Sequence, residues 1–235
     1  MYKLLAGIAL CLSVTASAQT ADEIITKHIA AIGGKDVIKS IKSQTIQADL
    51  SVMGSSLASN TTLLVGKGFK SVADFNGQEI IQVITPTGGW MVNPLAGQID
   101  PQPLTDEQVK GGQSVLEIGG DLLDYAAKGS KVELVGKEKV ESVDAFKIKL
   151  TNKDAKEIIY FIDPATYYVV KRESTANVQG QDMTTSATFS NFKKTDIGYV
   201  MPYTTVTNQG FEITINVSKV EFNKEVDPKI FVMSK

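Results

Sequence analysis

The sequence has very few of the side chains that carry most catalytic and metal chemistry, with one cysteine and one histidine among 235 residues. Cys11 lies in an N-terminal segment that we expect to be removed, which excludes disulfides, thiolate metal sites and cysteine nucleophiles from the mature chain. His28 alone cannot supply both a hydrolytic triad and a metal site, and no phosphate-binding glycine loop, zinc-protease motif or nucleophile elbow occurs. We therefore expect no catalysis and no cofactor, so function must reside in shape and apolar surface.

The sequence also lacks an excess of charge and, after its first residues, long apolar runs. The formal net charge is -2, with acids and lysines interspersed. Such a balance gives no electrostatic footprint for nucleic acid or for an anionic membrane surface. No later stretch approaches the roughly 20 apolar residues that a membrane-spanning helix needs. We expect a soluble, monomeric mature protein.

The N-terminus reads as an export signal. Lys3 is followed by the apolar segment Leu4 to Val14 and by the small residues Ala16-Ser17-Ala18. This order predicts cleavage between Ala18 and Gln19, a periplasmic location, and a single domain over residues 19–235. A lipid-modified Cys11 is the alternative, giving an anchored protein, but the bulky Leu10 precedes it; secretion is a further alternative.

Short β-strands dominate the segment from Ser43 to Phe222. Thr45 to Val52 alternates strictly between apolar and polar residues, and Asn76-Gly77 is a strong signal for a two-residue hairpin turn. The alternation changes phase near Ser218-Lys219, which predicts a β-bulge that bends the sheet. We predict a mainly β fold with about 11–12 antiparallel strands in a strongly curved sheet.

Two helical regions accompany these strands. Thr20 and Glu23 have capping-box spacing, and Gly33-Gly34 predicts the end of this N-terminal helical region. A helical insert is predicted from Thr105 to Lys128, beginning with the Thr105/Gln108 capping box. A second box at Ser114/Glu117, a break at Gly119-Gly120 and a cap at Asp121 predict two or three short helices. Their apolar residues should bury against the concave face of the sheet.

The candidate site is therefore a set of apolar side chains between the sheet and the insert. Arg172, the only arginine, is a candidate headgroup contact through its planar fork, although its neighbours Lys171 and Glu173 favour a solvated strand position. Carboxylate pairs such as Asp121 with Asp124 could serve glycoside hydrolysis, but Asp121 is better placed as a helix cap. Trp90 fits the core better than a ligand contact, and both roles can coincide at a cavity mouth. The predicted lining residues are Leu50, Val52, Leu63, Ile81, Trp90, Leu116, Leu122, Leu123 and Phe189.

Several short motifs resemble a known family of exported proteins. They are Ala21-Asp22-Glu23-Ile24-Ile25 through Ile32-Gly33-Gly34, Gly89 to Pro94 with Pro103 to Glu107, Phe161 to Thr166, and Val220 to Asn223 with Asp227 to Phe231. The chain resembles the outer-membrane lipoprotein-sorting proteins, the LolA/LolB-like carrier superfamily, and most of all its branch in Bacteroidetes-like bacteria. The best-known carriers use an arginine on an early strand, and Ser43 to Phe75 contains none, so no such residue is transferred.

The resemblance implies an unclosed half-barrel whose concave face is plugged by the N-terminal helix and the insert. It further implies a periplasmic carrier of lipidated protein or free lipid toward the outer membrane, with inner- and outer-membrane sorting components as further partners. One alternative is an exported, non-catalytic interaction module with a filled core. Another is an enzyme acting on a lipid or glycan, which a buried, close pair of carboxylates would favour.

Overall fold

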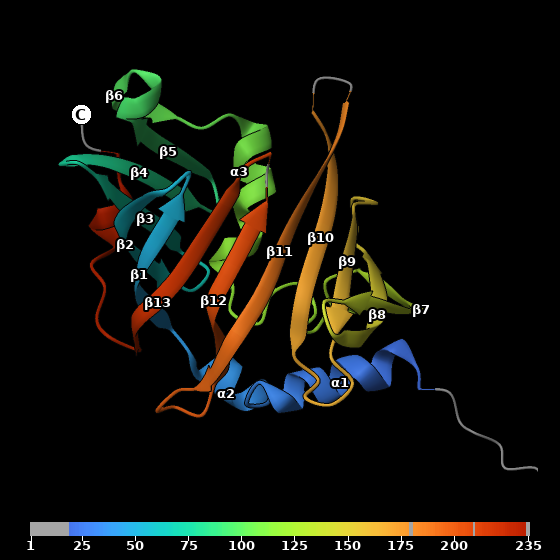
Figure 1. Cartoon of the computed structure of the whole chain (residues 1–235). Helices are drawn as coiled ribbons and strands as arrows, with labels where there is room; N and C mark the ends of the chain where they lie inside the picture. The colour runs from blue at the N-terminus through green and yellow to red at the C-terminus, as the bar shows by residue number, and fades with distance from the viewer. Residues whose placement is uncertain (1–18, 179–180, 209, 234–235) are drawn as a thin grey trace, which may run out of the picture.

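A computed structural model describes residues 19–178, 181–208 and 210–233 (Figure 1). The predicted signal segment, including Cys11 and Ala18, lies outside these residues, whereas Gln19 is described. Thirteen strands form one antiparallel sheet in the order β6-β5-β4-β3-β2-β1-β13-β12-β11-β10-β9-β8-β7. The strands are β1 (Ser43–Val52), β2 (Ser55–Leu64), β3 (Gly68–Phe75), β4 (Gln78–Thr85), β5 (Gly88–Asn93), β6 (Gln98–Pro103), β7 (Lys131–Val140), β8 (Val143–Thr151), β9 (Glu157–Ile162), β10 (Val169–Val178), β11 (Gln181–Lys194), β12 (Val200–Asn208) and β13 (Glu212–Phe222).

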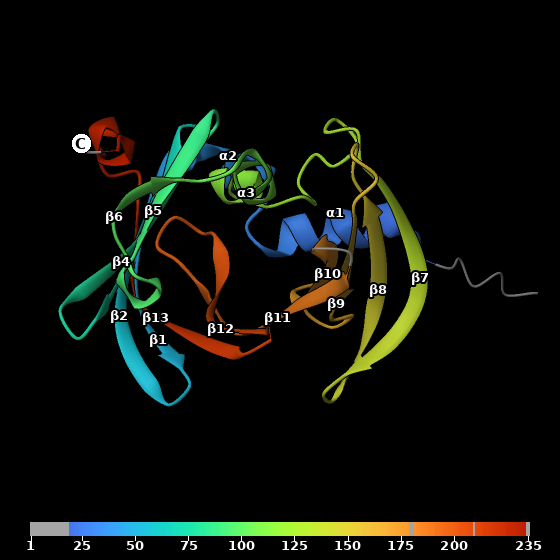
Figure 2. The ribbon, with the colours of Figure 1, turned by 90° about the horizontal axis from the view of Figure 1, so that it is seen from above.

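The sheet is open and strongly curved, as predicted. Its edge strands, β6 and β7, do not pair with each other, and Figure 2 shows two arms of strands rising on either side of β11 to β13. The strand number is thirteen rather than 11–12, because the segments on both sides of the short 3-10 helix η1 (Pro94–Ala96) pair as β5 and β6. This arrangement is an open half-barrel.

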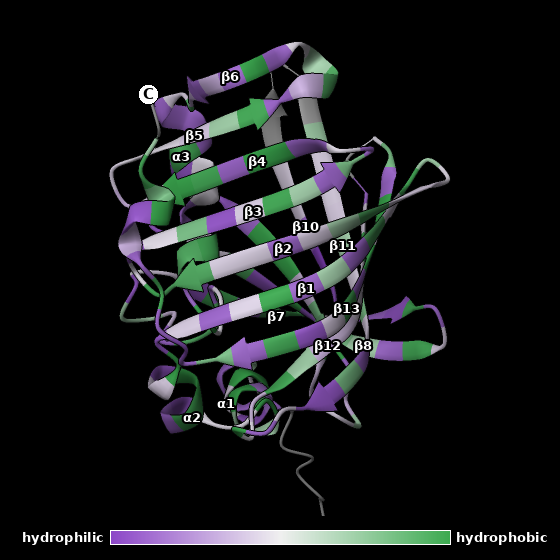
Figure 3. Ribbon diagram, turned by 90° about the vertical axis from the view of Figure 1, so that its left-hand side faces the viewer, coloured by the Kyte–Doolittle hydropathy of each residue, from purple (hydrophilic) through white to green (hydrophobic). Residues whose placement is uncertain are grey.

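The first and last strands along the chain, β1 and β13, lie side by side at the centre of the sheet. β1 pairs with β2 on one side and with β13 on the other. The register moves from Gln47 opposite Lys219 to Ala48 opposite Val217, so Ser218 is the extra residue of a bulge. The predicted bulge is confirmed, and it keeps the alternating apolar residues of β13 on the same face of the sheet as those of β1. Figure 3 shows this alternation along β1 to β4.

The helices cover the concave side of the sheet. α1 (Ala21–Ala31) begins with the predicted capping box between Thr20 and Glu23, and α2 (Lys35–Ser40) follows two glycines with positive φ. In Figure 2, α1, α2 and α3 (Asp106–Gly112) lie across the open side between the two arms. α1 buries Ile24 and Ile25 against β8 and β9 in a shared apolar core.

The insert is helical only in its first part. The Thr105/Gln108 capping box is formed, and α3 continues into the 3-10 turn η2 (Gln113–Leu116). The predicted helix from Asp121 and the predicted box at Ser114/Glu117 are both wrong, because residues 117–129 form bends and turns. Gly119, Gly120 and Asp124 have left-handed backbone angles, which interrupt a right-handed helix.

The insert nevertheless packs on the concave face, as expected. A Cβ atom on Gly112 would overlap the Cδ1 atom at the end of the Ile84 side chain, so α3 lies close against β4 at this point. The amide of Gly66 donates to the carbonyl of Leu116 at 2.9 Å. The opposite, convex face of β3 to β5 is covered by the C-terminal 3-10 turn η3 (Pro228–Phe231).

Candidate functional site

An apolar cavity of about 440 Å³ lies between the concave face and the insert. α1 contributes His28 and is followed by the lining residue Ile32, β11 contributes Phe189 and Phe192, and the insert closes one side from residue 114 to residue 122. This volume falls in the range typical of small-molecule sites, which are concave, mainly apolar and carry few polar groups. The remaining lining residues are Gln44, Tyr160, Val169, Arg172, Tyr199, Val200, Met201 and Pro202.

The apolar walls are built by packed clusters rather than by isolated side chains. Ile32 packs with Ile38, Leu123 and Val200, and the rings of Tyr168 and Phe192 stack with their centroids 4.5 Å apart. Burial raises the pKa of Tyr199 to about 12, so this phenol stays neutral beside the cavity. These clusters present mainly hydrocarbon surface to the cavity, which suits an apolar ligand.

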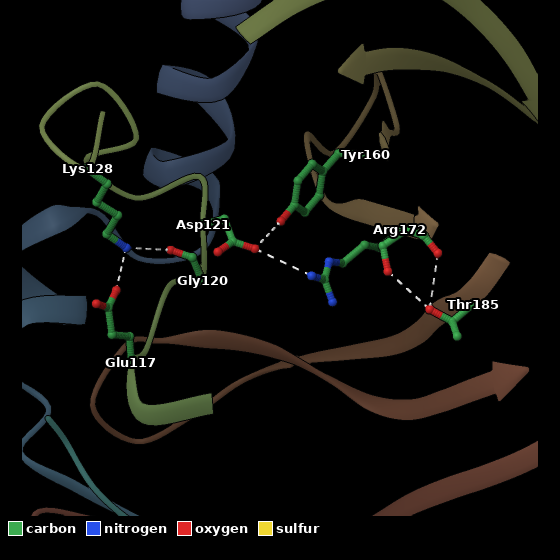
Figure 4. A network of polar contacts seen from close by, with 8 residues as sticks. Glu117, Gly120, Asp121, Lys128, Tyr160, Arg172 and Thr185 are labelled. Atoms are coloured by element: carbon green, nitrogen blue, oxygen red, sulfur yellow. Dashed lines mark hydrogen bonds and ion pairs between the residues drawn. The ribbon is translucent and has the colours of Figure 1, made fainter. Parts of the chain in front are cut away.

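One wall carries a polar network, shown in Figure 4. The hydroxyl of Tyr160 donates to Oδ2 of Asp121 at 2.9 Å, and Nη2 of Arg172 lies 3.5 Å from the same oxygen. Burial, together with the charge of Asp121, raises the pKa of Tyr160, while Arg172 acts in the opposite direction. Arg172 is therefore paired with the insert, while 36% of its side chain stays exposed on β10.

His28 lies on the cavity side of α1. Its Nδ1–H donates to the carbonyl of Tyr167 at 2.8 Å, and only 7% of the residue is exposed. Burial lowers the pKa of His28 in spite of this hydrogen bond, which favours the neutral ring. In the described part of the chain, no group of three or more His, Cys, Asp and Glu side chains is arranged to hold a metal ion.

A second, polar cavity of about 420 Å³ adjoins the apolar one. The two share the wall formed by Ser114, Glu117, Gly120, Asp121 and Arg172. The remaining lining residues of the polar cavity are Lys110, Gly111, Gln113, Lys128, Ser130, Asn152, Lys153, Asp154, Lys156, Ile158 and Ser174. An apolar chamber thus lies directly beside a charged one.

The structure brings some of the predicted lining residues to the apolar cavity. Leu122, Phe189 and Arg172 line it. Leu116 and Leu123 are buried where the insert packs, without lining the cavity. Leu50 and Val52 lie on the concave face of β1, farther along the strand than the lining residue Gln44.

The other predicted residues lie elsewhere on the sheet. Leu63 is buried opposite Gln44 on the concave face of β2. Ile81 and Trp90 lie on the convex face, where the indole Nε1–H of Trp90 donates to the carbonyl of Phe231 at 3.0 Å. These two side chains are part of the packing beneath the C-terminal segment and do not reach the cavity.

The sequence prediction missed several lining residues. Gln44 continues the alternating face of Ile46 and Ala48, so extending that pattern by one step would have found it. Phe192 follows Asn191, whose φ of 53° interrupts the alternation of β11, and nothing in the sequence marks this irregularity. His28 was not among the predicted lining residues, yet it is buried and lines the cavity.

Comparisons with known proteins rest on structure alone. No protein-family model and no curated protein matches the sequence significantly. Solved structures do match: an outer membrane lipoprotein-sorting protein domain from Vibrio parahaemolyticus has a TM-score of 0.58 at 17% identity, covering 89% of this chain and 94% of that one. A LolA superfamily protein from Nitrosomonas europaea has a TM-score of 0.57 at 15% identity, covering 92% and 98%.

A third match is a DUF1329 family protein from Desulfovibrio piger, with a TM-score of 0.50 at 12% identity, covering 90% of this chain and 96% of that one. All three matches extend over nearly the whole of both chains, so the likeness includes the sheet and its helical cover. No helix in the described residues is long and apolar enough to cross a membrane. The three structural matches together show that the chain has a LolA-like fold.

Proposed function

We propose that this protein is a periplasmic carrier that binds the acyl chains of a lipidated protein or a free lipid and moves them toward the outer membrane. The observation that carries this proposal is the apolar cavity of about 440 Å³ between the concave face and the insert. The lipoprotein-sorting description of the Vibrio parahaemolyticus domain agrees with it. The carrier acts without catalysis or cofactor, as a monomer that exchanges cargo with inner- and outer-membrane sorting components.

The cavity lining provides the main binding energy. Burying a methylene group contributes about 0.8 kcal/mol, and the effect depends on apolar area rather than on directional contacts. Such a site accepts chains of different structure, provided that they fit its volume. A carrier also needs a cover, because a large exposed apolar patch promotes aggregation when the protein is empty.

The insert is a suitable cover because its polar attachments are at or near the surface. Asp124 pairs with Lys35 and with Lys39, whose Nζ atom lies 2.7 Å from Oδ2 of Asp124. Exposed ion pairs of this kind contribute about 0–1 kcal/mol each. Breaking these ion pairs would therefore cost little, so the main cost of moving the turns around residues 117–129 is the exposure of the buried Leu122 and Leu123.

Native mass spectrometry of the mature protein tests this proposal after incubation with a synthetic diacylated lipopeptide. The expected result is a 1:1 complex that survives desalting. Val115→Trp, which introduces a bulky ring into the cavity lining, should reduce the bound fraction at least about tenfold. Val72→Trp is the matched control, since Val72 lies on the outer face of β3 beside Asn60 and Glu79.

If the wild-type protein binds neither the lipopeptide nor free lipid, or if both tryptophan variants retain lipid equally, the cavity is not a lipid site. A protein partner recovered together with unchanged binding in Val115→Trp would then support the interaction-module alternative. Thermal unfolding of each variant shows whether a loss of binding reflects loss of the fold.

A further inference from the structure

The polar cavity beside the apolar one has a charge opposite to that of the whole chain. Five basic and three acidic side chains line it, whereas the chain has a formal net charge of -2. Lys110 pairs with Asp154, Lys128 with Glu117 and Arg172 with Asp121. Lys153 and Lys156 have no ion-pair partner among the residues that the structure describes. The chamber is therefore suited to an anion.

Arg172 lies at the boundary of the two chambers and is incompletely satisfied. Its Nε atom is buried and has no hydrogen-bond partner among the described residues. Its contact with Asp121 is long, at 3.5 Å, and Asp121 also accepts the shorter bond from Tyr160. A guanidinium group forms its best bonds as a two-pronged contact with a carboxylate or phosphate, and Asp121 provides only one oxygen at the limit of hydrogen-bond distance.

We propose that the cargo is an amphiphile with an oxyanion headgroup, which enters the polar chamber and takes the place of Asp121 on Arg172. This inference rests on the proposed function, because the acyl chain would fill the adjoining apolar cavity. The shared wall makes the arrangement possible, since Gly120, Asp121 and Arg172 border both chambers. A carboxylate or a phosphate satisfies the same donors.

The exchange links the headgroup to the cover. Asp121 belongs to the insert, so its release from Arg172 removes one of the polar contacts that hold the turns from 117 to 129 over the sheet. An anionic headgroup would thus favour the open insert, whereas a neutral headgroup would leave the Asp121–Arg172 pair in place. The ligand can shift the insert only to the extent that it binds the open arrangement more tightly than the closed one.

The test compares three probes with the same acyl chain: a fatty acid, a lysophosphatidic acid and a monoacylglycerol. The wild-type mature protein should bind both anionic probes at least about tenfold more tightly than the neutral one, and added salt should reduce only this difference. Arg172→Gln should abolish the preference. Lys171→Gln is the control, since the neighbouring Lys171 pairs with Glu173 and lies over the ring of Phe161.

Asp121→Asn tests whether Arg172 binds the headgroup or only holds the insert in place. It removes the competing charge while the amide oxygen can still accept from Tyr160, so the anionic probes should bind several-fold more tightly and the neutral probe should not. Lys153→Gln combined with Lys156→Gln distinguishes the headgroups. A larger loss for lysophosphatidic acid identifies phosphate, and a larger loss for the fatty acid identifies carboxylate.

The outcomes separate the two proposals. Binding of all three probes with equal affinity overturns the oxyanion site and leaves the carrier function intact. Binding of none overturns the carrier function itself. If Arg172→Gln does not fold, weaker anionic binding in Asp121→Asn, or a preference that does not respond to salt, still refutes the site.

Discussion

The dependence of affinity on acyl-chain length follows from the size of the apolar cavity. At ~30 Å³ for each water-sized group, 440 Å³ holds about 15 such groups, and a methylene is of roughly this size. Each additional methylene buried should contribute about 0.8 kcal/mol, which tightens Kd about fourfold. From about 8 to about 14 carbons the gain is about 5 kcal/mol at most, after which the curve should flatten because further carbons remain in solvent.

Isothermal titration calorimetry with saturated fatty acids, each below its micelle-forming concentration, measures this series. The heat-capacity change of binding should become more negative up to the same chain length, because it reports buried apolar area. An affinity that does not depend on length between about 8 and about 14 carbons would refute burial of the chain in this cavity. Unbroken tightening to about 20 carbons would refute the volume on which the estimate depends.

Three further predictions concern stability. Gly111→Ala, whose Cβ meets no atom within 4 Å, should stabilise α3 by about 0.5–1 kcal/mol in urea unfolding, whereas Gly112→Ala should gain less because its Cβ would displace the end of the Ile84 side chain; equal effects would contradict the packing. Leu122→Ala should cost about 2–5 kcal/mol, since Leu122 is 3% exposed and packs against α1 and β9, and a cost below about 1 kcal/mol would show that the insert is not packed there. Burial lowers the pKa of His28 in the folded protein, so below pH 6.5 the unfolded chain binds more protons than the folded chain. The free energy of unfolding should therefore fall as the pH decreases through 6.5. His28→Gln should weaken this pH dependence in thermal unfolding measured from pH 7.5 to pH 5.

Local sequence signals identified the elements that local interactions determine. The Thr20/Glu23 and Thr105/Gln108 boxes and the turn at Asn76-Gly77 depend on residues close in the chain. The bulge at Ser218 forms against the distant β1, but a local change in the alternation of β13 marks it. All four are present. The resemblance added the open half-barrel, which alternation alone implied only as a curved antiparallel sheet.

The sequence did not determine which partner a polar side chain would choose. Asp121 has the spacing of a helix cap, yet it accepts from Tyr160 and Arg172, which are 39 and 51 residues away in the chain. Trp90 and Ile81 alternate correctly along their strands, but alternation does not reveal which face is concave. That assignment depends on where the C-terminal segment packs, a contact between residues 141 positions apart.

The central position of β1 and β13 has a consequence for how the molecule folds. Each arm is a series of hairpins that can form early, but the seam that joins them pairs Gln44 with Phe222 and Val52 with Ile213. Contacts of such large sequence separation form slowly, because a long loop must be ordered first. Until the last strand has emerged, β1 and β12 each expose an unpaired edge, and a chain truncated before residue 212 should aggregate as two unjoined half-sheets.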